Sequence, residues 1–122
     1  SCAAQLGMQQ AAFEHLSTLV EAEDKDFGPQ ALETMAKTLP IIYEKEFYKL
    51  MKGVRQPAKM ITDAAKDFVA YRMAKGAYRS GDYKTASGYA AQVSEKSEYY
   101  DEARFLSAMN SWAQGDRTNA LK

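Results

Sequence analysis

A spacing of 34 residues is the feature of this sequence that most restricts its fold. Gly81-Asp82 returns as Gly115-Asp116, and other positions hold the same offset without a gap. A period of this length is typical of stacked helix-turn-helix units. We therefore expect antiparallel helices in the second half of the chain. The further matched pairs are Tyr71 with Phe105, Ala74 with Ala108, Tyr78 with Trp112, and Ala86 with Ala120.

The rest of the chain is also predicted to be helical. Glycine (7) and proline (3) are scarce, and no segment keeps the alternation of polar and apolar residues that is typical of a strand. One apolar stripe includes Met8, Leu16 and Val20. The sequence thus predicts an all-α protein of about seven helices. Their expected spans are about 3–23, 29–39, 41–53, 57–78, 83–93, 99–114 and 118–122.

The two Gly-Asp pairs predict the turns. Glycine accepts the left-handed conformation at the end of a helix, and the aspartate after it can cap the next helix. We therefore expect turns at 80–82 and 115–116, with a new helix beginning at Thr118.

The stretch from Tyr78 to Ala86 resembles the tetratricopeptide repeat (TPR) family. That family's turn is Gly-Asp-Tyr followed by two polar residues and Ala, and the second copy differs by having Arg117 in place of Tyr. The resemblance covers residues 67–122 and implies a fragment of an α-solenoid, with the second repeat incomplete at Lys122. Residues 1–66 are expected to form divergent or capping helical hairpins.

The resemblance also implies where a partner would bind. In the family, the first helix of each unit lines a concave groove that holds a peptide or a partner helix. Aromatic side chains at helical spacing can equally well form the core, whereas Lys75 and Arg79 are expected to be exposed charges that contribute little to folding. The candidate partner-binding residues are Tyr71, Lys75, Tyr78, Arg79, Phe105, Met109 and Trp112.

The charge and composition of the sequence argue against several other classes of protein. The net charge is zero, which argues against a globally basic nucleic-acid binder. A single His (His15) and a single Cys argue against metal sites and Ser/His/Asp hydrolysis, so no cofactor, metal or catalytic residue is expected. The acidic residues between the repeats, Asp101 and Glu102 among them, are read as first-turn charges of a helix rather than as a catalytic pair. Residues 34–59 are rich in lysine, which indicates either a solvated face or a patch for an anionic partner.

Cys2 adds a hypothesis about location. A cysteine followed by Ala3-Ala4 resembles the start of a mature bacterial lipoprotein, which would tether the domain to a membrane without a spanning helix. The alternative is an incidental free thiol. We therefore expect a non-enzymatic protein-interaction scaffold in the bacterial envelope or periplasm, with the cytoplasm as the alternative location. The alternative functions are a non-catalytic helical domain of a larger envelope enzyme and a purely structural bundle.

Overall fold

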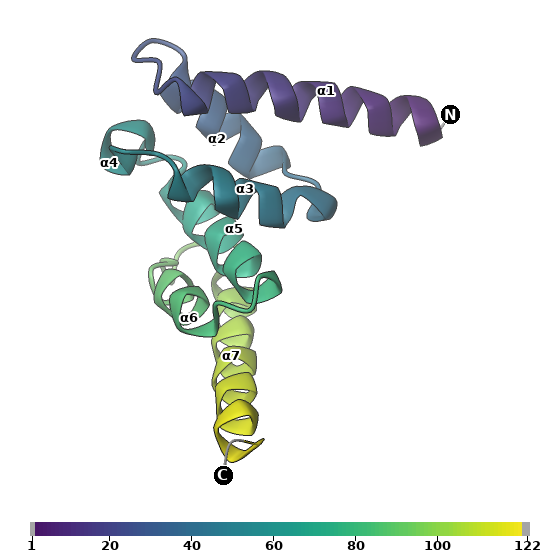
Figure 1. Cartoon of the computed structure of the whole chain (residues 1–122). Coiled ribbons are helices and arrows are strands. Elements are labelled where there is room, and N and C mark those ends of the chain that lie inside the picture. The colour runs from purple at the N-terminus through teal and green to yellow at the C-terminus, as the bar shows by residue number, and fades with distance from the viewer. Residues whose placement is uncertain (1, 121–122) are drawn as a thin grey trace.

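Helices joined by turns and loops make up the described part of the chain, which contains no strand. The computed structural model describes the backbone of residues 2–120 and the side chains of residues 3–115. The expected all-α fold with about seven helices is confirmed in this part of the chain (Figure 1). The elements are α1 (Cys2–Glu21), α2 (Gly28–Thr38), the 3-10 helix η1 (Ile41–Tyr43), α3 (Glu44–Lys52), α4 (Pro57–Met60), α5 (Lys66–Arg79), α6 (Tyr83–Ala91) and α7 (Tyr100–Ala120).

The first core cluster joins the second half of α1 to α2, α3 and α5. Its fully buried side chains include Val20, Leu32 and Phe47. The first half of α1 extends away from this core, so Met8 of the predicted apolar stripe is exposed (Figure 1). The remaining stripe packs against α2, and Phe13 stacks on Tyr43 of η1, and these contacts hold α1 in place.

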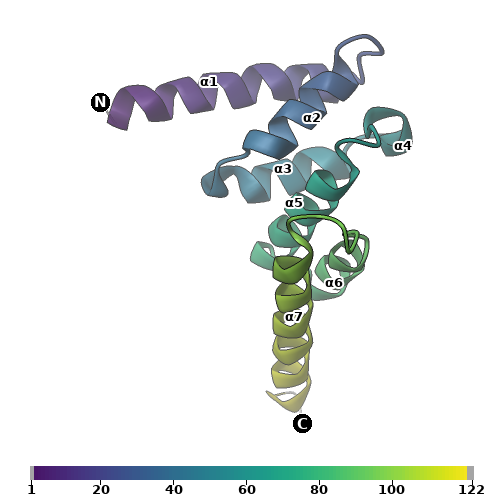
Figure 2. The ribbon, with the colours of Figure 1, turned by 180° about the vertical axis from the view of Figure 1, so that it is seen from behind.

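The second core cluster lies among α5, α6 and α7. Alanines form much of it, with Ala74, Ala90 and Ala103 buried, so the three helices approach closely. α6 packs against both α5 and α7, and Figure 2 shows α1 to α4 at one end of the molecule, α6 and α7 at the other, and α5 between them. α5 contributes side chains to both clusters and fixes one to the other. The expected division between residues 1–66 and 67–122 falls at the start of this shared helix.

The turn at Gly81 is confirmed. Gly81 has a φ of 83°, in the left-handed region, and the N–H of Asp82 donates to the carbonyl of Ala77 at 2.9 Å. The expected capping by the Asp82 side chain is wrong. Its carboxylate instead accepts a hydrogen bond from the hydroxyl of Tyr48 on α3 at 2.9 Å, so the turn is tied to the first cluster.

The turn predicted at Gly115 is wrong, because α7 runs without interruption through Gly115-Asp116 to Ala120. A glycine inside a helix costs only about 1 kcal/mol, and the helical hydrogen bonds outweigh that cost. The repeat partners also differ in burial, since Ala74 is buried and Ala108 is exposed.

The long helix predicted from Pro57 is also wrong, because α4 ends at Met60 and α5 begins at Lys66. Thr62 lies in the break, where its hydroxyl donates to Glu33 of α2 at 2.8 Å and accepts from the N–H of Ala65. A side-chain hydroxyl that bonds the backbone in this way competes with continued helix. The break turns α5 against α3.

Two features of the chain concern a possible relation to a membrane. The side chain of Cys2 lies outside the described residues, so the lipidation hypothesis has no structural counterpart here. Within residues 2–120, no helix has the length and apolar character that crossing a membrane requires.

Candidate functional site

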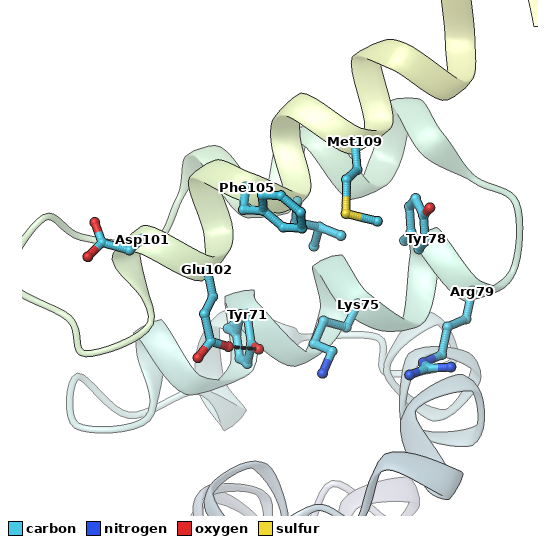
Figure 3. A pocket seen from close by; sticks show the side chains of 9 residues that line it. Tyr71, Lys75, Tyr78, Arg79, Asp101, Glu102, Phe105 and Met109 are labelled. Carbon is cyan, nitrogen blue, oxygen red and sulfur yellow. Dashed lines mark hydrogen bonds between the residues drawn. The ribbon is translucent and has the colours of Figure 1, made fainter. Parts of the chain in front are cut away.

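A groove of about 480 Å³ lies between α5 and α7, on the side of these helices away from α6 (Figure 3). It is lined by Tyr71, Lys75, Tyr78, Arg79, Asp101, Glu102, Phe105, Leu106 and Met109. Apolar side chains form its middle, and charged side chains lie along its edge and at its ends.

Helical spacing produces this arrangement. Tyr71, Lys75 and Tyr78 follow one another at intervals of four and three residues, so they share one face of α5. Phe105 and Met109 share a face of α7 for the same reason. Because α6 packs on both helices, it holds these two faces toward a common groove.

Six of the seven candidate partner-binding residues line the groove. The exception is Trp112, whose side chain is 71% exposed and lies beyond the lining. It follows Phe105 and Met109 at intervals of four and three residues, so it continues their stripe along α7. Trp112 is therefore not a core residue, and Phe105, 67% exposed, is not one either.

One end of the groove is acidic. The hydroxyl of Tyr71 donates a hydrogen bond to the carboxylate of Glu102, which links α5 to α7. Burial, followed by this contact with an anion, raises the pKa of Tyr71 far above its ordinary value, so the phenol stays protonated. The Tyr71 ring stacks on Tyr99, with 4.4 Å between centroids, and this packing fixes its position. Asp101 is exposed at the same end.

The opposite end and one edge of the groove are basic, and a buried carboxylate organises them. Glu44, in the first turn of α3, has no exposed surface. Arg79 donates from Nε to its Oε1 at 2.7 Å, and Lys75 Nζ lies 3.1 Å from its Oε2. Arg72 Nη1 lies 3.7 Å from the same Oε2. Three cations thus surround one carboxylate, which leaves a local excess of two positive charges.

Lys75 is half-buried rather than exposed as expected, and Arg79 is exposed as expected, but both pair with a buried carboxylate, which argues against the small role in folding that was expected of them. Their side chains are 24% and 45% exposed, and both neutralise a carboxylate that is fully removed from water. Removing one partner of such a carboxylate is costly, because the buried charge loses its compensation. These two residues therefore serve the core and the groove together.

Glu44 was missed by the sequence reasoning, and so was the part that Asp101 and Glu102 take in lining the groove. A signal for Glu44 existed: Arg72, Lys75 and Arg79 stand three and four residues apart, which places three cations on one helical face. Such a stripe packed against another helix needs an anion. Which helix would supply the anion was not visible in the sequence.

The groove places cations in fixed positions beside exposed apolar side chains. Lys75 Nζ lies 5.4 Å from the centroid of the Tyr71 ring, and Glu44 holds Arg79, so both cations have fixed positions. Preorganised charges beside exposed apolar side chains suit the binding of a chain segment. Within the described part of the chain, no three His, Cys, Asp or Glu side chains cluster in a way that could hold a metal ion.

Comparison of the chain with protein-family models, with curated proteins and with solved structures finds no match.

Proposed function

We propose that the groove between α5 and α7 binds a segment of another protein, and that the chain acts as a protein-interaction scaffold. The observation that carries this proposal is the groove itself, which combines exposed apolar side chains with charges held in fixed positions. Apolar side chains left exposed in a concavity with a polar edge are typical of interaction sites.

The rigidity of the groove supports the proposal. α5 belongs to both core clusters, so one wall is fixed by the whole molecule. The bond from Tyr71 to Glu102 fastens the other wall, α7, to it. A site that is formed before binding loses little conformational entropy when a ligand enters.

We also propose that α5, α6 and α7 form a TPR-like unit. The Gly81 turn and the packing of α6 on both α5 and α7 support this relationship. The uninterrupted helix α7 limits the similarity to one unit, because residues 100–120 do not form a second helical hairpin.

The test is a selection of binding peptides from a random peptide library displayed on phage, followed by titration of the selected peptides. Phe105→Asp places a charge in the middle of the groove, and its parent side chain is already 67% exposed, so the fold should survive. Ser111→Asp makes the same change on an exposed part of α7 outside the groove and serves as the matched control.

Peptides that bind the unchanged chain and the Ser111→Asp variant, but lose at least about tenfold in affinity for Phe105→Asp, would support the proposal. Far-ultraviolet circular dichroism checks that both variants are folded. Selected peptides that bind all three proteins equally, or a selection that yields none, would count against a groove function.

A further inference from the structure

We infer that the segment bound in this groove is extended and presents an acidic, an apolar and a basic side chain at alternate positions. The acidic side chain lies toward Arg79 and the basic one toward Asp101. This inference rests on the proposed function and adds the chemistry of the partner.

The charges of the groove set the order. Figure 3 shows Asp101 and Glu102 at one end and Arg79 at the other, with Lys75 on the edge between them. Glu44 balances only one of the three cations around it, so the basic end attracts an anion. At the acidic end, Glu102 accepts from the neutral hydroxyl of Tyr71, and none of the ion pairs among the described residues involves Glu102 or Asp101, so this end attracts a cation.

The length of the groove is set by α5. From Tyr71 to Arg79 the wall rises about 12 Å, at about 1.5 Å per residue. An extended segment of about five residues is enough to reach both charged ends, whereas a helical segment would need about nine.

The same length sets the spacing. An extended chain advances about 3.3 Å per residue, so four steps cover about 13 Å. Side chains two residues apart point to the same side. Three of them can therefore face the groove at once: one toward Lys75 and Arg79, one against Phe105 and Met109, and one toward Asp101. The acidic, apolar and basic side chains must follow one another in this order along the groove. A segment bound in either N-to-C direction can meet this requirement if its sequence is reversed accordingly.

The test compares three fluorescein-labelled peptides with identical Gly-Ser flanks. The mixed peptide contains Glu-Ser-Leu-Ser-Lys, the acidic peptide Glu-Ser-Leu-Ser-Glu, and the basic peptide Lys-Ser-Leu-Ser-Lys. Fluorescence anisotropy at low ionic strength measures binding, because salt screens exposed charges. We expect the mixed peptide to bind about fivefold more tightly than either of the others, as one misplaced charge at a partly exposed site would cause.

A charge reversal in the protein gives the decisive comparison. Asp101→Lys changes the acidic end at an exposed position that no described ion pair uses. We expect this variant to lose the preference for the mixed peptide over the acidic one, because the introduced cation offsets the charge of Glu102. Asp26→Lys, an exposed aspartate outside the groove, is the matched control and should keep the preference for the mixed peptide.

The outcomes separate this inference from the proposed function. Equal binding of all three peptides, or an unchanged preference in Asp101→Lys, would overturn the inference and leave a groove that binds segments of another kind. Binding of none of the three, together with an empty library selection, would overturn both.

Discussion

Arg79 Nε lies 2.7 Å from Oε1 of Glu44, a carboxylate with no exposed surface. The two residues belong to α3 and α5, which are separated in the chain by α4, and their contact joins the first core cluster to the edge of the groove. The same ion pair therefore compensates a buried charge and holds a cation at the edge of the groove.

Glu44→Ala should lower the free energy of unfolding by about 3 kcal/mol. The substitution leaves three cations around an empty space, and removal of one member of a buried ion pair costs about 3–5 kcal/mol. We expect a value at the lower end of this range because Lys75 and Arg79 are partly exposed, so water can solvate them when the carboxylate is removed. Urea unfolding measures the change. Glu46→Ala, at an exposed position on the same helix, should change the unfolding free energy by less than about 0.5 kcal/mol. Equal effects at both positions would contradict a central role for Glu44.

Gly76→Ala should destabilise the protein by about 2 kcal/mol or more. A side chain on Gly76 would lie 2.5 Å from the carbonyl oxygen of Glu44 and 2.5 Å from Cβ of Tyr48, so α3 and α5 would have to separate. Gly88→Ala is the matched control, because its Cβ meets nothing within 4 Å and alanine is the better helix former. This control should stabilise α6 by about 0.5–1 kcal/mol. Thermal unfolding of the two variants should shift in opposite directions, and a shared direction would refute the close approach of the two helices.

Trp112→Ala should leave stability within about 0.5 kcal/mol of the unchanged protein, because the side chain is 71% exposed. Phe47→Ala, at a fully buried position, should instead cost about 3–5 kcal/mol. Since the chain has a single tryptophan, its fluorescence reports on this position alone. A peptide that extends along α7 past Met109 should shift the emission to shorter wavelength. A large loss of stability in Trp112→Ala would mean that this residue is buried after all.

Stability should fall in acid partly through Glu23, in the loop between α1 and α2. Its carboxylate accepts from the N–H of Gln56 at 2.9 Å and from the N–H of Arg55 at 3.3 Å, and these bonds hold its pKa below the ordinary value. A lowered pKa in the folded state means that the contribution is complete above the unfolded pKa of about 4.3 and is lost as the pH falls through the folded pKa.

Glu23→Gln tests this assignment. The melting temperature of the variant should lie below that of the unchanged protein at pH 7, and the gap should narrow toward pH 3. Glu21→Gln, at the exposed end of α1, provides the control for simple loss of a charge. A gap for Glu23→Gln that stays constant with pH would exclude Glu23 as a source of acid sensitivity.

The local sequence determined the all-helical fold and the face that α5 presents to the groove, although not every helix boundary. The spacing of Tyr71, Lys75 and Tyr78 was enough to place them together, because the periodicity of a helix is a property of the chain itself. The turn at Gly81 was predictable for the same reason, since glycine takes a positive φ without strain.

Only the tertiary structure decided which of these local possibilities was realised. Gly81 and Gly115 carry the same Gly-Asp signal, yet only Gly81 ends a helix, because Tyr48 binds Asp82 and α6 packs back on α5. The placement of Glu44 among three cations was likewise decided by the packing of α3 on α5. Helix periodicity and glycine conformation act over a few residues, whereas burial and charge compensation depend on residues that lie far apart in the sequence and meet only when the chain has folded.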